Sequence, residues 1–136
     1  MLQTSEVVAF VGSADLPQAR MFYEQVLGLR LIEYNDFACV FDANGTMLRV
    51  TAVAEVARAG YTVLGWRVSD IAATVRGLGA KGIAFLRYDG MDQDESGIWT
   101  TPGDDQVAWF ADPDGNVLSL TQFRLTAGEV SPLGAG

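Results

Sequence analysis

A chain of 136 residues is long enough for one domain that buries about two-thirds of the surface exposed by its unfolded form. Its formal net charge of −8, with nine Lys and Arg, argues against nucleic-acid binding, which needs clustered basic residues. No apolar run approaches the roughly 20 residues of a membrane span, and one cysteine without a secretory signal is typical of the cytoplasm.

The first half of the chain predicts one strand, one helix and three further strands. Residues 6–11 are a β-rich run, and Asp15 then caps a helix that has Pro17 in its first turn and Gly28 as its stop. Apolar residues between these ends recur at helical spacing, so one face of the helix can pack on a sheet. Strands are predicted over residues 29–34, 37–42 and 46–53, and this unit reads βαβββ.

The second half repeats that pattern after a connector at residues 54–61. A strand is predicted over residues 63–68, and Asp70 caps a helix that ends near Ala80. Further strands are predicted over residues 83–87, 98–101, 106–111 and 116–123, with a long acidic loop at 89–97. Apart from one additional strand, this half repeats the βαβββ pattern. We expect a single domain over residues 1–124, with modules at about 5–53 and 62–123, and a mobile tail at 125–136.

A repeated hairpin supports the duplication. Residues 112–115, Asp-Pro-Asp-Gly, form a turn signal between two apolar runs, which predicts a β-hairpin. Residues 41–50 align with this hairpin glycine on glycine, and the alignment matches Arg49 with Ser119. The chain therefore predicts an α+β fold of two βαβββ modules that form a curved mixed sheet. The helices cover one face of this sheet, and its concave side is where we expect a ligand.

These motifs resemble the vicinal oxygen chelate superfamily, which includes glyoxalases, extradiol dioxygenases and bleomycin-resistance proteins. The resemblance rests on Asp15-Leu16, Phe22-Tyr23 and Val26-Leu27-Gly28-Leu29 in the first helix and on Asp112-Pro113-Asp114-Gly115-Asn116 in the last hairpin. It covers nearly the whole chain up to Phe123 and implies the glyoxalase/bleomycin resistance fold. The motifs are specific for that fold and do not indicate a particular reaction.

The resemblance also implies where a metal would lie in an enzyme of this superfamily. Such enzymes hold a divalent ion with His, Glu or Gln side chains, and strand register carries the four positions onto Glu6, Arg49, Val63 and Ser119. Only Glu6 is a ligand, the chain has no histidine, and Arg49 would place a permanent cation beside the ion. We therefore expect no metal cofactor, and we predict an ion pair between Glu6 and Arg49, which is either structural or leaves Arg49 available to an anionic ligand.

Strand parity places Phe10, Met47, Gly65 and Arg67 on the concave side together with Arg49. Trp99 and Trp109 are candidates for the same wall, although tryptophans more often pack in a core. The acidic loop at 89–97 is compatible with a lid or a cation loop, but most such charge runs are solvated and this spacing does not match an EF-hand. Cys39 reads as a small buried hydrophobe, because no histidine is present to activate its thiol.

Three functional hypotheses follow. The first is a metal-free protein that binds a small, possibly anionic organic ligand for sequestration or resistance, with the ligand-binding residues Phe10, Met47, Arg49, Arg67, Trp99, Trp109 and Ser119. The alternative is an enzyme, a lactoylglutathione lyase-like protein, an isomerase or a dioxygenase, in which Glu6 is the catalytic base and a divalent metal is weakly held or absent. The third is an interaction module whose concave side is packed shut. Because relatives often pair two chains, we expect a homodimer.

Overall fold

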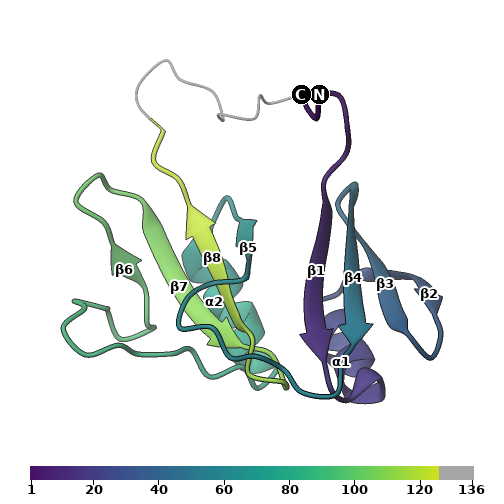
Figure 1. Ribbon diagram of the computed structural model, residues 1–136. Helices are drawn as coiled ribbons and strands as arrows, with labels where there is room; N and C mark the ends of the chain where they lie inside the picture. The colour runs from purple at the N-terminus through teal and green to yellow at the C-terminus, as the bar shows by residue number, and fades with distance from the viewer. Residues whose placement is uncertain (126–136) are drawn as a thin grey trace.

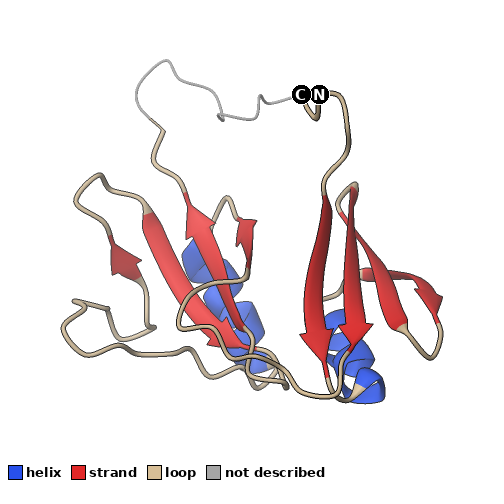
Figure 2. Ribbon diagram, in the orientation of Figure 1, coloured by secondary structure: helices blue, strands red, loops and turns tan. Residues whose placement is uncertain are grey.

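The computed structural model describes residues 1–125, in which two four-stranded sheets each pack against a helix (Figures 1 and 2). The strand orders are β1-β4-β3-β2 and β5-β8-β7-β6, and the inner edges of the two sheets are β1 and β5. The first module comprises β1 (Val8–Ser13), α1 (Leu16–Met21), the π-helical turn η1 (Phe22–Val26), β2 (Arg30–Tyr34), β3 (Ala38–Ala43) and β4 (Thr46–Ala52). The second comprises β5 (Leu64–Arg67), α2 (Ile71–Ala80), β6 (Trp99–Thr100), β7 (Gln106–Ala111) and β8 (Val117–Gln122).

The duplication is confirmed by strand pairing. β1 runs parallel to β4 with Gly12 opposite Thr51, and β5 runs parallel to β8 with Arg67 opposite Thr121. Each module then opens its helix with an aspartate cap, because Oδ1 of Asp15 accepts a hydrogen bond from the Gln18 backbone at 3.1 Å and Asp70 does the same for Ala73 at 3.0 Å. The predicted α+β fold of two βαβββ modules is therefore present, in the form of two separate four-stranded sheets.

The strand predicted over residues 83–87 is wrong. These residues have no strand geometry, although the Leu86 backbone donates one hydrogen bond to the carbonyl of Trp109 at 2.8 Å. The Leu86 carbonyl instead accepts from the side-chain amide of Gln93 at 2.9 Å, and the same Nε2 donates to the Gly97 carbonyl at 2.8 Å. A side chain thus satisfies backbone groups that a neighbouring strand would otherwise pair.

The first helix ends as predicted at Gly28, which has a φ of +76°. Its last turn is wider than an α-helical turn, since the Leu27 backbone donates to the carbonyl of Phe22 at 3.0 Å. Neither of the helices described in residues 1–125 has the length and apolar character needed to cross a bilayer. The predicted mobile tail lies outside the described residues, apart from Leu125.

The two faces of each sheet differ in burial as the parity predicts. Leu48 and Phe110 are fully buried on the helix side, whereas Phe10 is 62% exposed and Met47 43% exposed on the opposite side. The helix-side residues of both modules belong to one apolar cluster that includes Tyr23. The helix faces therefore form the core, and the other faces of the sheets carry the predicted ligand-binding residues.

A polar network joins the modules at the turn between β7 and β8. The buried carboxylate of Asp112 accepts hydrogen bonds from the Tyr23 hydroxyl at 2.7 Å and from the Asn116 side chain at 2.8 Å. The same Asn116 amide donates to the carbonyl of Gly12 in β1 at 2.8 Å, and the backbone of Ala14 donates to Asp114 at 2.9 Å. The final hairpin is therefore held to the first module by hydrogen bonds, and Tyr23, Asp112 and Asn116 in this network are buried.

Tyr23 gives this network a pH dependence at high pH. Burial, followed by the nearby charge of Asp112 and the hydrogen bond to it, raises the pKa of the Tyr23 hydroxyl far above its ordinary value of 10.0. The unfolded chain therefore loses this proton near pH 10 while the folded chain keeps it. We expect the free energy of unfolding to fall above that pH, by about 1.4 kcal/mol per pH unit from this group. Urea titrations at several alkaline pH values should show a shallower decline in Tyr23→Phe, whereas equal slopes in the two proteins would contradict this assignment.

Candidate functional site

Two equivalent rows of side chains cross the faces that lie opposite the helices. In the first sheet Arg49 of β4 pairs with Phe10 of β1 and with Val40 of β3. In the second sheet Ser119 of β8 pairs with Gly65 of β5 and with Trp109 of β7. The structure thus assembles most of the predicted ligand-binding residues in these two rows, with Met47 two residues before Arg49 on β4.

Strand pairing shows that Glu6 and Val63 are not equivalent positions of the two modules. The Val63 backbone donates to Val117 at 2.9 Å, and the matching partner in the first module is Met47, which pairs with Val8. Val8 is therefore the equivalent of Val63, and Glu6 precedes β1. Phe10, the partner of Arg49, lies four positions after Glu6, which corresponds to about 13 Å along a strand.

This equivalence allows us to ask whether the side chains at the four positions could hold the divalent metal of the superfamily's enzymes. The four positions become Val8, Arg49, Val63 and Ser119, which offer two apolar side chains, a permanent cation and one hydroxyl. Catalytic metal sites generally have three good protein ligands, and this set has none. Elsewhere in residues 1–125, no group of three His, Cys, Asp or Glu side chains is arranged to hold an ion. The residues of this site do not fit the metal.

The predicted ion pair between Glu6 and Arg49 is also wrong. The salt bridges formed within residues 1–125 are Arg20–Glu24 and Arg30–Asp42, both at 3.4 Å. Arg49 is half-buried, and its Nη1 lies 3.9 Å from the sulfur of Met47. A guanidinium that faces outward from a sheet without a carboxylate partner retains donors for an anion.

Three aromatic side chains form a wall beside this row in the second sheet. The Trp99 and Trp109 rings stack with centroids 6.2 Å apart at 29°, and the Tyr88 ring meets Trp109 edge-on at 5.4 Å and 87°. Both tryptophans are half-buried, so each keeps part of its surface accessible. Sequence reasoning missed Tyr88, which follows a segment wrongly predicted as a strand and takes its position from a hydrogen bond between its backbone and Gln93 at 2.8 Å.

Phe10, Val63 and Arg67 also contact parts of the structure outside the two rows. Phe10 and Val63 line a cavity of about 340 Å³ between the modules, to which the connecting segment contributes Val56. Arg67 lies at the end of β5, where its guanidinium carbon is 5.0 Å from the centroid of the Phe123 ring. Gly65 leaves room for the Ser119 hydroxyl, since a Cβ at this position would lie 2.8 Å from its oxygen.

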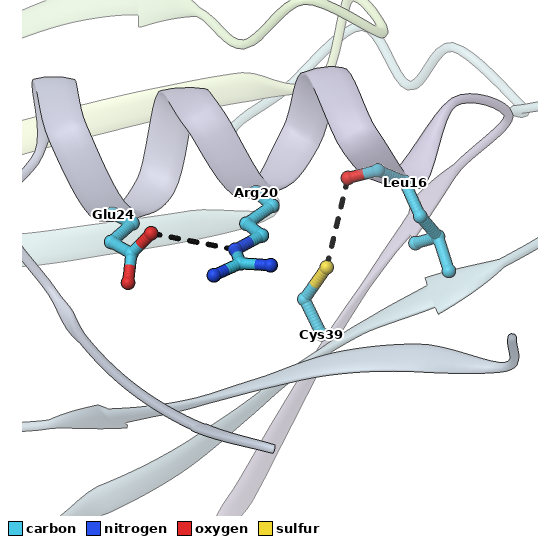
Figure 3. Close-up of polar contacts among 4 residues, drawn as sticks. All are labelled: Leu16, Arg20, Glu24 and Cys39. Atoms are coloured by element: carbon cyan, nitrogen blue, oxygen red, sulfur yellow. Dashed lines mark hydrogen bonds and ion pairs between the residues drawn. The ribbon is translucent and has the colours of Figure 1, made fainter. Parts of the chain in front are cut away.

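The acidic loop and the cysteine have structural roles. Oδ1 of Asp94 accepts hydrogen bonds from the Ser96 and Ile98 backbones, both at 2.9 Å, so this carboxylate shapes the loop. The Cys39 side chain is fully buried and its thiol lies 3.7 Å from the Leu16 carbonyl, beneath α1 (Figure 3). Burial raises the pKa of this thiol, with smaller effects from Arg20 and Glu24, so the predicted structural role fits its surroundings.

The sequence of the chain matches a known protein family. Residues 6–120 match the model of the Glyoxalase/Bleomycin resistance protein/Dioxygenase superfamily. A search of curated proteins found no significant match.

Several solved structures share the fold at low sequence identity. A bleomycin resistance determinant encoded on the transposon Tn5 is 21% identical, with a TM-score of 0.70 over 90% of this chain and 100% of that one. A lactoylglutathione lyase from Agrobacterium tumefaciens is 17% identical, with a TM-score of 0.69 over 88% and 95% of the two chains. A glyoxalase family protein from Enterococcus faecalis is 18% identical, with a TM-score of 0.69 over 90% and 100%.

Proposed function

The chain belongs to the Glyoxalase/Bleomycin resistance protein/Dioxygenase superfamily, and we propose that it binds a small organic anion without a metal. The observation that carries this proposal is the replacement of the metal positions by Val8, Arg49, Val63 and Ser119. Arg49 supplies a positive charge at the place where the relatives' enzymes use an ion. Its guanidinium can bind a carboxylate or phosphate through two parallel hydrogen bonds.

The ligand-binding surface in this proposal combines that charge with apolar and aromatic contacts. Phe10 and Met47 flank Arg49 on the first sheet, while Trp99 and Trp109 provide a stacked aromatic surface on the second. Such a combination of many apolar contacts and a few polar groups is typical of small-molecule sites. Sequestration of a toxic or reactive compound is the role that fits binding without a catalytic group, and the resistance determinant of Tn5 shares this fold. We place the protein in the cytoplasm, where Cys39 would remain reduced.

We further propose that two copies of the chain associate to complete the site. Exposed apolar side chains lie on the strand faces of both modules: Val8 is 42% exposed, Phe10 62% and Val63 39%. Clusters of exposed large apolar residues mark interaction surfaces. A second copy is the occupant that would cover these faces and bring residues from both sheets around one ligand.

Substitution of Arg49 tests the anion-binding role. With 1-naphthoate as an aromatic carboxylate probe, we expect saturable quenching of tryptophan fluorescence, because the probe would lie against Trp109 while Arg49 binds its carboxylate. Arg49→Met should weaken this affinity about tenfold through the loss of a charge-assisted hydrogen bond pair. Arg76→Met removes the same charge from the exposed side of α2 and should leave the affinity unchanged. Equal affinities for wild type and Arg49→Met would contradict the proposal.

The alternative, an enzyme that uses Glu6 as a base, is separated by metal analysis. Glu6 is exposed and precedes β1, so it has no position beside Arg49 or Ser119 from which to act on a shared ligand. Purified protein should carry no stoichiometric divalent ion after dialysis. A tightly held zinc, iron, manganese or nickel ion that is lost in Glu6→Gln would favour the enzyme instead.

A further inference from the structure

The second module has a cavity at the C-terminal ends of β5 and β8, outside the row of Arg49 and Ser119. Its volume is about 680 Å³, which is within the range of small-molecule sites. Arg67 and Ser69 line it from the end of β5, Phe123 and Arg124 from the end of β8, and Asp104 from the turn before β7. Two of the nine basic residues of a chain with net charge −8 therefore line one cavity.

The first module provides an internal comparison. A cavity of about 470 Å³ lies at the corresponding ends of β1 and β4, lined by Ser13, Leu16, Ala52 and Val53 among others. Because Arg67 pairs with Thr121 as Gly12 pairs with Thr51, the equivalents in the first module can be read directly from the register.

Arg67 occupies the position of Gly12. Arg124 lies three residues after Thr121, as Ala54 lies three residues after Thr51, so these two positions are also equivalent. Phe123 likewise stands where the first module has Val53. The duplicated fold produces the cavity in both modules, but only the second replaces small neutral residues with two cations. The strand geometry does not require these arginines, since the first module forms the equivalent strand ends with Gly12 and Ala54.

Contacts within the cavity hold both arginine segments in place. The guanidinium of Arg67 lies over the Phe123 ring at 5.0 Å, which orients it while its in-plane N–H groups stay available. The Arg124 backbone donates to the Asp105 carboxylate at 2.8 Å, and this contact fixes the chain beyond β8. Neither arginine takes part in the two salt bridges found within residues 1–125.

Helix α2 begins beside the cavity, and its first amides already have hydrogen-bond partners. The amide of Ile71 already donates to Gln122 at 2.8 Å and the amide of Ala73 donates to Asp70 at 3.0 Å. Because these amides already have partners, α2 can act on a ligand only through its dipole. The arginines are then the groups that would donate hydrogen bonds to the ligand. Asp104 lines the cavity, and the carboxylates of Asp70 and Asp105 lie beside it at the cap of α2 and at the Arg124 backbone, so an anionic ligand depends on direct contact with the two arginines.

We propose that this cavity binds the phosphate group of a small phosphorylated molecule. Two guanidinium groups match the charge of a phosphate monoester, which reaches about −2 on three terminal oxygens, better than the single charge and two oxygens of a carboxylate. The site goes beyond the proposed function, which depends on Arg49. Strand parity had placed Arg67 with the concave-side residues around Arg49. In this proposal Arg67 instead binds a second ligand in its own cavity.

A nuclear magnetic resonance titration of the full chain tests the site. Phenyl phosphate, at constant ionic strength, should shift the amide resonances of Ser69 and Phe123 saturably. Inorganic phosphate should produce the same shifts with equal or weaker affinity. Benzoate should shift these two amides with at least tenfold weaker affinity than phenyl phosphate, because it lacks the third oxygen acceptor. Binding of inorganic phosphate alone would overturn the assignment to a phosphorylated molecule, and equal binding of benzoate would overturn the assignment to phosphate.

Arginine variants separate this site from the Arg49 surface. Arg67→Gln and Arg124→Gln should each weaken phenyl phosphate binding about tenfold, through the loss of a charge-assisted contact. Arg76→Gln removes the same charge from the exposed surface of α2 and should bind as the wild type does. In Arg49→Met the saturable shifts of the Ser69 and Phe123 amides should remain, because these residues line the second cavity and Arg49 does not, so a failure of the proposed function would not affect this result. Unchanged affinity in both Arg67→Gln and Arg124→Gln would overturn the proposal.

Discussion

Replacement of Asp112 by alanine should lower the free energy of unfolding by about 3–5 kcal/mol, because several buried donors lose one acceptor together. Asp112 is 5% exposed, and its carboxylate accepts from the Tyr23 hydroxyl at 2.7 Å and from the backbones of Asp114 and Asn116, both at 2.9 Å. The Asn116 side chain is a fourth donor at 2.8 Å. The Tyr23 hydroxyl, in a fully buried side chain, would have no partner in the variant.

Urea denaturation followed by tryptophan fluorescence and by circular dichroism measures this loss. Asp92→Ala removes the same charge from the exposed acidic loop and should change the stability by no more than about 0.5 kcal/mol. Tyr23→Phe should cost less than Asp112→Ala, because it leaves the carboxylate with its other three donors. A double variant that costs the sum of the two single losses would show that these side chains act independently, against the network described above.

Local sequence signals predicted the parts of the fold that short-range chemistry determines. Asp15 and Asp70 were identifiable as helix caps because a cap needs only its own side chain and the next turn of backbone. Gly28 was identifiable as a helix stop for the same reason, since its positive φ favours glycine. The alternation of buried and exposed residues in β4 followed from strand geometry and the position of the helices.

Errors arose where the structure depends on partners far away in the sequence. The strand at residues 83–87 failed because Gln93, and not a neighbouring strand, binds the carbonyl of Leu86. The position of Glu6 depended on which residue of β1 lies opposite Arg49, and pairing places Phe10 there. In the register of the two modules Val8, two residues after Glu6, is the equivalent of Val63. Strand parity identified Arg67 from the sequence, but its position beside Arg124 at one cavity appears only in three dimensions.

Replacement of Phe10 by aspartate should convert the proposed dimer to a monomer, with association at least about 100-fold weaker, or ~2.7 kcal/mol. Phe10 is 62% exposed on β1, so the change removes little from the core and should leave the chain folded. A charge in place of a large aromatic anchor would instead be buried against the second copy without a partner.

Sedimentation equilibrium over a range of concentrations measures this effect, and the matched control is Phe37→Asp. Phe37 is 76% exposed and precedes β3, away from Phe10, so its variant should associate as the wild type does. Because Phe10 is also a proposed ligand contact beside Arg49, the oligomeric state, and not the binding of 1-naphthoate, is the readout of this variant. A monomeric wild type, or a Phe10→Asp variant that remains dimeric, would show that the exposed face of β1 is not the association surface. The ligand would then have to bind to the surfaces of a single chain, where Arg49 and the Trp99–Trp109 pair lie on separate sheets.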